Sequence, residues 1–410
     1  MIDYSLLKSV FSEIRGNKAS FKKKEVWMVN EKVNVNEKIN KKTVIMFAGA
    51  IIAFLIGSGF ATGQEILQYF AGYGYLGLAG SAVVFLLLVY VCSSFLEVGH
   101  REQFEKGNDI YKYYCGEKLG FFFDYFSTIF CFMSFVVMVA GASATMTQHY
   151  GTPAVVGGLL IASLSLITVL TGLSRIVEIV GRVGPIIVAI AICVGLVSIF
   201  KNYTNLDPET VSLSIESLKS SEKLVKASSS WYLAAFSYVG FCMLWLAGFL
   251  ASLGAKAESS LEAKSGGILG GALFSLAVVI VTLGLLSSID MTAGTQIPML
   301  YLANNIHPLF SSIFALIILA GIFSTAVPLL WSVSARFTKE GTKPFKLLTF
   351  LLATLGFFVG IWLPFDKLVN VVYVINGYLG GILLVIMCYK SINRRLKKKT
   401  VPSVEDIQKS

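Results

Sequence analysis

Long apolar runs constrain this chain more than any other feature of its sequence. A run of about 20 apolar residues can cross the hydrocarbon core of a bilayer as a helix. Only 14% of the 410 residues are charged, whereas a soluble domain typically carries about 25%. The pattern predicts an all-α integral membrane protein with about ten transmembrane helices, near residues 43–70, 74–99, 119–148, 153–171, 184–200, 231–253, 267–289, 308–336, 344–363 and 367–390.

The distribution of basic residues predicts how the chain is oriented in the membrane. Cytoplasmic connections of membrane proteins carry an excess of Lys and Arg. The N-terminal stretch FKKKEV, the C-terminal stretch KSINRRLKKK and every second connection between the apolar runs are rich in these residues. We therefore expect both termini in the cytoplasm. A loosely ordered basic tail at 1–42 and a second basic tail at 391–410 would flank one transmembrane domain at 43–390.

Ten spans divide into two groups of five, at 43–200 and 231–390. An odd number of spans per group makes the second group enter the membrane from the opposite side, which is the inverted repeat common in secondary transporters. In such transporters the sites are typically formed by discontinuous helices in corresponding positions of the two halves. The first span contains GSGFATG and the sixth contains FSYVGFCML. We therefore predict breaks in both, although the sixth has only Gly240 as a weak helix former.

Three glycines interrupt the first apolar run within seven residues: Gly57, Gly59 and Gly63. Each costs about 1 kcal/mol relative to alanine inside a helix, so unwinding here is inexpensive. Unwound backbone at membrane depth is tolerated only where protein surrounds it or where it lines a polar cavity. The pattern predicts a buried polar site in this segment. The alternative is that small residues merely allow neighbouring helices to approach closely.

Glu65, directly after these glycines, has two interpretations. The spacing Thr62-x-x-Glu65 fits a capping box, in which Thr62 caps a second half-helix and Glu65 bonds back to it. A carboxylate inside a membrane segment is also a candidate for titration or for contact with a substrate. The sequence leaves both open, and Glu65 remains a candidate coupling residue.

The eighth span carries oxygen-bearing residues on one face. Gly321, Ser324 and Thr325 stand at positions i, i+3 and i+4, so they face the same side of a helix. Two hydroxyls and a carbonyl made accessible by glycine suit a hard cation, which prefers several oxygen ligands. The alternative is that Ser324 and Thr325 bond carbonyls of their own helix, as such residues often do in membranes.

The stretches LIGSGFATGQEILQYF, FSTAV and VINGYLGG resemble the YkvI-like family of bacterial ten-helix membrane proteins. That family is similar to the amino acid–polyamine–cation superfamily, which has the LeuT-like fold. The resemblance implies a Na⁺ site formed by Ala53, Ile56, Gly321, Ser324 and Thr325. It also implies a substrate site at the two helix breaks, formed by Gly57, Ser58, Gly59, Phe60, Thr62, Gly63, Tyr238, Gly240 and Phe241.

The resemblance implies a cation-coupled secondary transporter in the bacterial cytoplasmic membrane, working by alternating access on a small solute such as an amino acid or related amine. In proton-coupled relatives a lysine in the fifth span takes the place of the cation. The apolar part of the fifth span here has no lysine, so the resemblance favours Na⁺ over H⁺ as the coupling ion. The alternative is a nutrient or germinant receptor subunit that binds ligand without transporting it.

The sequence favours no other class of protein. It has no metal-ligand spacing, no nucleic-acid motif and no cluster of nucleophile, base and oxyanion donors. We therefore expect no enzyme activity, no nucleic-acid partner and no cofactor beyond a coupling Na⁺. The expected partners are the lipid bilayer and a small solute, and the sequence predicts no particular protein partner.

Overall fold

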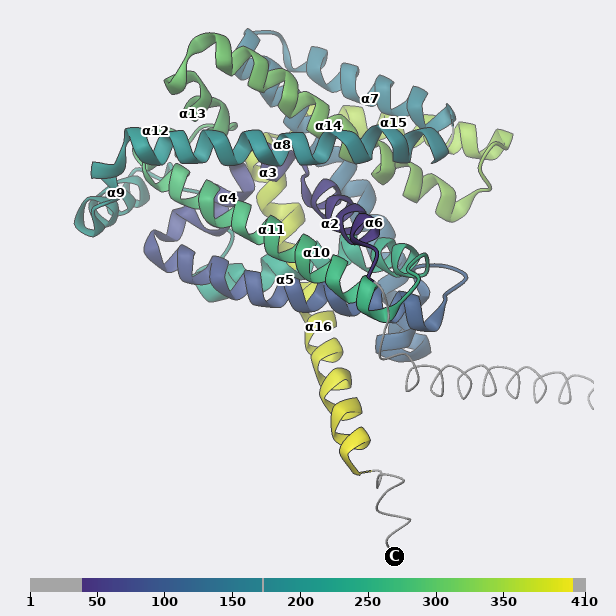
Figure 1. Cartoon of the computed structure of the whole chain (residues 1–410). Helices are drawn as coiled ribbons and strands as arrows, with labels where there is room; N and C mark the ends of the chain where they lie inside the picture. The colour runs from purple at the N-terminus through teal and green to yellow at the C-terminus, as the bar shows by residue number, and fades with distance from the viewer. Residues whose placement is uncertain (1–38, 172, 401–410) are drawn as a thin grey trace, which may run out of the picture. The chain divides into compact units, whose positions relative to one another are not determined.

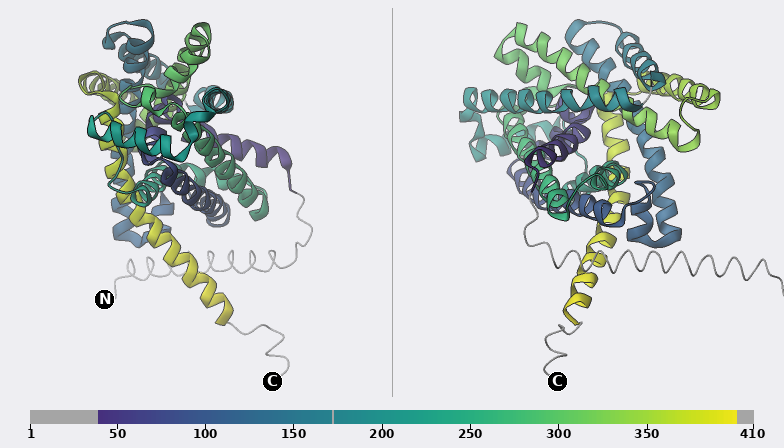
Figure 2. Two further views of the ribbon diagram at one scale, coloured as in Figure 1. Left: turned by 90° about the vertical axis from the view of Figure 1, so that its left-hand side faces the viewer. Right: turned by 45° about the vertical axis from the view of Figure 1, so that its right-hand side comes forward.

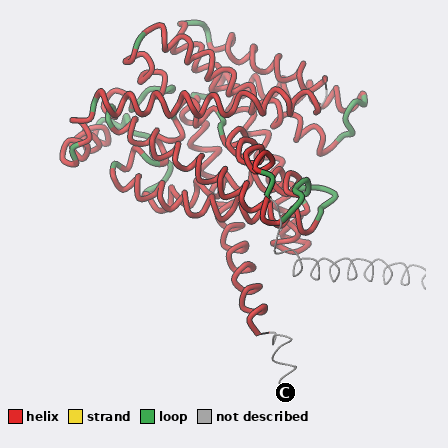
Figure 3. The backbone as a smooth tube through the Cα atoms, in the orientation of Figure 1, coloured by secondary structure: helices red, strands yellow, loops and turns green. Residues whose placement is uncertain are grey.

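The computed structural model describes residues 39–171 and 173–400 (Figure 1). The described chain consists of helices and short connections and contains no strand (Figure 3). Its helices belong to one compact unit that begins at Lys41. Most of the predicted tail at 1–42 and the second half of the predicted tail at 391–410 lie outside the described residues.

The predicted spans correspond to the long helices of the structure. Eight of the described helices are long and apolar enough to cross a membrane by length and composition. The first predicted span is divided among three helices, and the fifth corresponds to α8. The elements are α2 (Lys41–Leu55), α3 (Ser58–Thr62), α4 (Gln64–Tyr69), η1 (Ala71–Tyr73), α5 (Tyr75–Glu102), α6 (Asp109–Tyr150), α7 (Ala154–Thr171), α8 (Leu173–Lys201), η2 (Tyr203–Leu206), α9 (Pro208–Ser220), α10 (Trp231–Gly254), α11 (Ser260–Leu286), α12 (Ile289–Thr292), α13 (Pro298–Ile306), α14 (Pro308–Phe337), α15 (Lys343–Trp362) and α16 (Phe365–Thr400).

Helix packing within this unit follows a pattern that repeats between its two halves. The second, third and fourth spans of the first half pack against their counterparts in the second half, as α5 on α11, α6 on α14 and α7 on α15. The first and fifth spans of each half also pack together, α2 against α8 in the first half and α10 against α16 in the second. The fifth span of each half contacts the third span of the other half, α8 against α14 and α16 against α6. Figure 2 shows these helices from two further sides. This correspondence is what two related five-helix repeats produce.

The first predicted span is broken, as the glycines predicted. Helix α2 ends at Leu55, and α3 and α4 meet at Gly63. Gly63 has a φ of 81°, a left-handed conformation that glycine adopts at little cost. A Cβ at Gly63 would also lie 2.5 Å from the Met299 side chain of α13. The break therefore has two separate points, on either side of the short helix α3.

The predicted break in the sixth span is wrong. Helix α10 runs without interruption from Trp231 to Gly254. Gly240 serves a different purpose, because a Cβ there would lie 1.9 Å from the carbonyl oxygen of Gly377 in α16. The glycine allows the backbones of α10 and α16 to cross at close range, as small residues do in membrane bundles. One glycine without a proline does not distinguish such a crossing from a break.

Candidate functional site

The first interruption of the broken helix exposes backbone carbonyls. The Gly57 amide donates to the Leu55 carbonyl at 3.0 Å, two residues earlier in the chain. A continuing α-helix would direct that amide to the carbonyl of Ala53, four residues earlier. The change leaves the Ala53 carbonyl without its helical donor, and it turns the Ile56 carbonyl toward α14.

Helix α14 meets this interruption through Thr325. The Thr325 hydroxyl donates to the Ile56 carbonyl at 2.7 Å, across 269 residues of sequence. The neighbouring Ser324 hydroxyl donates to the Gly321 carbonyl of its own helix at 2.8 Å. Both side chains are buried. Ser324 therefore follows the alternative in which the hydroxyl bonds its own helix, and Thr325 joins the two predicted halves of the cation site.

The five residues predicted to bind a cation are all buried and offer oxygen atoms. Three carbonyl oxygens, from Ala53, Ile56 and Gly321, and two hydroxyl oxygens, from Ser324 and Thr325, belong to residues that are all buried. Hard cations prefer neutral and anionic oxygen ligands of this kind. Oxygen ligands are also the only donors these five residues offer.

Of the two interpretations of Glu65, the capping box with Thr62 is not formed in the structure. The Thr62 hydroxyl donates to the Gly59 carbonyl at 3.2 Å and accepts from the Gln64 amide at 3.3 Å. Gly63 takes the N-cap position of α4 without any side-chain cap. The Glu65 carboxyl group instead accepts a hydrogen bond at Oε1 from the Tyr238 hydroxyl, at 2.6 Å.

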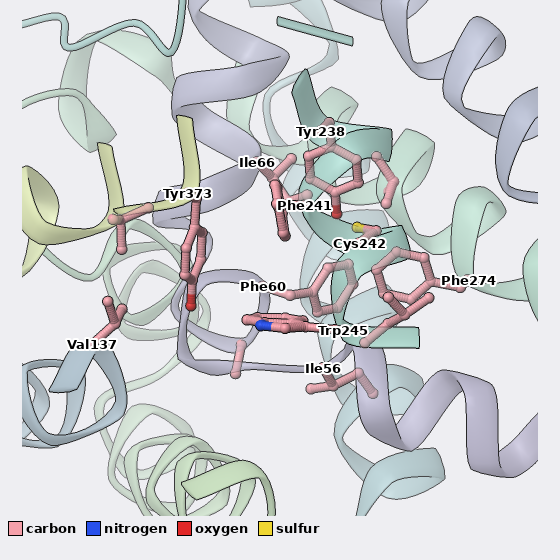
Figure 4. Packing of buried hydrophobic residues seen from close by; sticks show 14 of the residues in the cluster. Ile56, Phe60, Ile66, Val137, Tyr238, Phe241, Cys242, Trp245, Phe274 and Tyr373 are labelled. Carbon is pink, nitrogen blue, oxygen red and sulfur yellow. The ribbon is translucent and has the colours of Figure 1, made fainter. Parts of the chain in front are cut away.

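Aromatic rings surround the Glu65 carboxyl group. Tyr238 and Phe241 of α10 contact each other edge to face, with ring centroids 4.9 Å apart. Phe241 stacks on Tyr373 of α16 at 4.9 Å, and Tyr373 meets Trp245 edge to face at 5.4 Å. Figure 4 shows these side chains of α10 and α16 facing one another. The rings are fully or almost fully buried, so the structure is closed to solvent around the carboxyl group.

Gly59 brings the carboxyl group against the broken helix. A Cβ on Gly59 would lie 2.5 Å from Oε2 of Glu65 and 3.2 Å from the Tyr373 ring. No larger residue fits here without displacing one of these groups. The predicted substrate residues Gly59 and Tyr238 therefore both lie at Glu65, and Phe241 lies beside them.

Two polar atoms at this point have no hydrogen-bond partner in the described part of the chain. They are Oε2 of Glu65 and Oε1 of Gln64, both buried. The hydroxyls of Tyr373 and Tyr69 lie beside those of Ser58 and Ser237, respectively. A buried polar group left unpaired costs about 1–3 kcal/mol, and native proteins keep few of them. The unpaired Oε2 of Glu65 is therefore an exception that the packing of the described residues does not explain.

The other predicted substrate residues lie around the break but face different neighbours. A Cβ on Gly57 would lie 3.0 Å from Met138 of α6 and 3.3 Å from Trp245. The Phe60 ring packs against Phe274 of α11, with centroids 5.2 Å apart. Gly240 faces α16 at the helix crossing. The structure thus brings Gly59, Tyr238 and Phe241 together at Glu65, while Phe60, Gly63 and Gly240 face packing contacts.

A polar network that the sequence did not predict joins the connections expected on the cytoplasmic side. Asp124 of α6 accepts hydrogen bonds from Arg336 of α14 and from the Asn108 amide, the latter at 2.7 Å. The Arg336 guanidinium also lies 4.9 Å from the centroid of the Tyr125 ring. A Cβ on Gly248 of α10 would lie 2.1 Å from Asn108. The network therefore links α6, α14 and α10 at one end of the helices.

A second network closes the opposite end, where the outer connections were expected. The side-chain amide of Gln68 in α4 donates to the backbone carbonyl of Asp366 at 2.9 Å, and the side-chain amide of Asn370 in α16 donates to Oε1 of Gln68 at 3.0 Å. The backbone amide of Ala227 also donates to the Gln68 carbonyl at 3.0 Å. Burial lowers the pKa of Lys226, whose ammonium lies 5.1 Å from the Tyr73 ring centroid. These contacts involve partners too distant in sequence for a local pattern to reveal.

Sequence similarity to two bacterial proteins covers most of the chain. The chain is 22% identical over 361 residues to the uncharacterized membrane protein YkvI of Bacillus subtilis (strain 168), covering 87% of this chain and 99% of YkvI. It is 24% identical over 339 residues to the uncharacterized protein YyaD of the same organism, covering 82% of this chain and 93% of YyaD. No model of a known protein family matches the chain.

Solved transporter structures share the arrangement of helices. MhsT in complex with L-phenylalanine has a TM-score of 0.57 at 15% identity, with 83% of this chain and 87% of MhsT covered. The Eremococcus coleocola manganese transporter gives 0.58 at 16% identity, with 91% and 92% covered. A Na⁺-coupled sialic acid symporter gives 0.54 at 13% identity, with 84% and 77% covered. The chain is thus YkvI-like in sequence and LeuT-like in fold, as its motifs predicted.

Proposed function

We propose that this protein is a Na⁺-coupled secondary transporter of a small solute, such as an amino acid or related amine, in the bacterial cytoplasmic membrane with both termini inside. The observation that carries the proposal is the hydrogen bond from the Thr325 hydroxyl to the Ile56 carbonyl, at 2.7 Å. It joins the interruption of the first span to α14 at a set of buried oxygen atoms. The likeness of the fold to that of a Na⁺-coupled sialic acid symporter supports the same function.

The carbonyls of Ala53, Ile56 and Gly321 and the hydroxyls of Ser324 and Thr325 would hold the ion. The two hydroxyl protons now satisfy carbonyl oxygens. On ion binding, these hydroxyls would turn their lone pairs toward the cation, so that the same oxygens replace water around it. The site therefore changes its hydrogen bonds without any change in net protein charge.

Coupling would follow from where this junction lies. It connects the end of α2 to α14, so a cation bound there favours conformations that hold the two helices together. A ligand shifts a conformational equilibrium by the difference between its affinities for the two states. Solute bound at the break would add to the preference for the same closed state, and the pair would cross together by alternating access.

Thermal stability of the purified protein in NaCl and in KCl at equal ionic strength tests the cation site. A ligand present at 100 times its Kd adds about 2.7 kcal/mol of stability. We expect sodium to raise the melting temperature of the wild type. The melting temperature of the double variant Ser324→Ala/Thr325→Ala should be the same in sodium and in potassium. A matched control is Ser334→Ala/Thr349→Ala, because those buried hydroxyls bond only carbonyls of their own helices. It should keep the sodium response.

Solute flux separates a transporter from a receptor. Proteoliposomes with an inward sodium gradient should accumulate a solute that stabilises the protein, and collapse of the gradient should abolish accumulation. A solute that stabilises the protein without being accumulated would support the receptor alternative. Equal stability in sodium and potassium would contradict the proposed cation site.

A further inference from the structure

Glu65 places a buried carboxyl group at the closed helix break. It is 1% exposed, and its Oε2 has no hydrogen-bond partner in the described part of the chain. None of the ion pairs formed by the described residues includes it. An ionised carboxylate buried without a cation is strongly unfavourable. In this closed conformation the group must therefore carry a proton or meet a positive charge supplied from outside the protein.

The neighbours of Glu65 supply no such charge. The titratable groups that face it are the phenols of Tyr69, Tyr238 and Tyr373 and the thiol of Cys242, from α4, α10 and α16. The other elements packed on α4, namely α3, η1, α11 and α13, direct no charged side chain toward it. All of these neighbours are neutral at physiological pH.

We propose that Glu65 binds an organic ammonium group of the transported solute and gives up its proton when it does so. The inference rests on the proposed transport function and names its substrate class. In the closed state described here, Glu65 holds the proton. When the site opens, the proton leaves Oε2 for water, and the ammonium group takes its place beside the carboxylate.

The chemistry around Glu65 favours an ammonium ion over other ligands. Carboxylates attract cations directly, and the faces of Tyr, Phe and Trp rings attract them through their quadrupoles. Tyr238, Phe241, Trp245 and Tyr373 supply such rings in one cluster. The Tyr238 hydroxyl donates to Oε1, which stabilises the ionised form that the bound cation requires.

The same arrangement disfavours a solute that carries a carboxylate near its amine. Glu65 lies against Gly59 within the broken helix, where backbone amides could otherwise receive a substrate carboxylate. A second negative group at this position would face Glu65 at close range, and like charges repel. The inference therefore narrows the solute from amino acids in general to amines that lack a neighbouring carboxylate.

Isothermal titration calorimetry on the purified full-length protein in NaCl tests the inference. The probes are methylammonium, tetramethylammonium and choline. The comparison compounds are 3,3-dimethylbutanol, a neutral isostere of choline, and glycine betaine, which adds a carboxylate. Tetramethylammonium and choline have no proton to lose from nitrogen, so any proton released comes from the protein. A proton released on binding is taken up by the buffer and adds the buffer's ionisation enthalpy to the measured heat. Titrations in two buffers that differ in ionisation enthalpy therefore give the number of protons released.

We expect at least one ammonium probe to bind more tightly than both comparison compounds, with release of about one proton per site at acidic pH. Its affinity should fall as the pH falls, by up to about tenfold per unit, because the proton competes for the same carboxylate. Glu65→Gln should weaken binding about ten- to a hundredfold. Glu97→Gln, which changes a carboxylate paired with Lys264 elsewhere, should bind as the wild type does.

The outcomes distinguish this inference from the sodium site. Glu65→Gln should retain the sodium-dependent rise in melting temperature, which also shows that it folds. Ammonium binding that is unaffected by Glu65→Gln, binding without proton release, or equal binding of glycine betaine would overturn the inference and leave the sodium site standing. Failure of every ammonium probe in a protein that still responds to sodium would also overturn it.

Discussion

At the scale of single residues, the bond between Thr325 and Ile56 makes a prediction about stability without ions. Thr325→Val keeps the shape of the side chain but leaves the buried Ile56 carbonyl without its hydroxyl donor. An unpaired buried carbonyl costs about 1–3 kcal/mol. We expect Thr325→Val to lower the melting temperature in KCl. Thr325→Ser keeps the hydroxyl, so its melting temperature should stay close to that of the wild type. Equal melting temperatures for the two variants would show that the hydrogen bond contributes little.

Sequence reasoning identified some individual residues but not the pairs they form. The glycines between Gly57 and Gly63 predicted a break because their cost in a helix is local and known. The resemblance placed Ile56 and Thr325 in one site, and the structure brings them into contact. The partner of Glu65 was missed, because Tyr238 lies 173 residues away. The local pattern suggested a cap instead, since Thr62 and Glu65 have the right spacing.

At the scale of elements, the crossing of α10 and α16 predicts an asymmetry between two glycines. A Cβ on Gly240 would lie 1.9 Å from a backbone oxygen of α16, whereas a Cβ on Gly49 of α2 meets nothing within 4 Å. Overpacking of this kind typically costs about 1–3 kcal/mol or more. We expect Gly240→Ala to lower the melting temperature strongly. Gly49→Ala should be neutral or stabilising by up to about 1 kcal/mol.

This comparison is informative because both residues are glycines inside membrane helices. If Gly240→Ala had the same melting temperature as the wild type, α10 and α16 could not cross as closely as they do in the structure. The measurement is a melting curve in detergent, with size-exclusion chromatography to confirm that each variant is monodisperse.

Helices were easier to predict than their interruptions. Apolar runs located the spans because length and hydropathy are properties of each run alone. The ends differ most where helices continue beyond the apolar run, as α16 does to Thr400. The supposed break at Gly240 failed because the cost of a glycine can be offset by close packing against a helix that lies 137 residues further along the chain.

At the scale of the whole transmembrane unit, the network around Asp124 predicts how one end opens. Removing one partner from a buried ion pair leaves an uncompensated charge and costs about 3–5 kcal/mol. Arg336→Gln should therefore destabilise this end more than Asp124→Asn, which removes the buried negative charge. We expect faster hydrogen exchange at 103–108 and 330–337 in Arg336→Gln, measured by mass spectrometry.

A matched control for that experiment is Lys264→Gln. Lys264 pairs with Glu97 at 2.9 Å, but its side chain is 43% exposed. Exposed pairs contribute about 0–1 kcal/mol, so exchange at the same segments should stay near that of the wild type. Equal acceleration in both variants would mean that the Asp124 network does not hold this end closed in particular.

The two interruptions of the first span are two separate candidate hinges in one transmembrane segment. The first interruption lies at Ile56, beside the proposed sodium ligands, and the second lies at Gly63, just before Glu65. Between them lies α3, a helix of five residues. Because the backbone hydrogen-bond pattern of a continuous helix is interrupted at both places, we expect α2 and α4 to change their tilt independently of each other during transport. An ion bound at the first interruption would then fix the tilt of α2, and a proton or amine at Glu65 would fix the tilt of α4. Because α3 connects the two interruptions, ion binding and solute binding would be coupled through it.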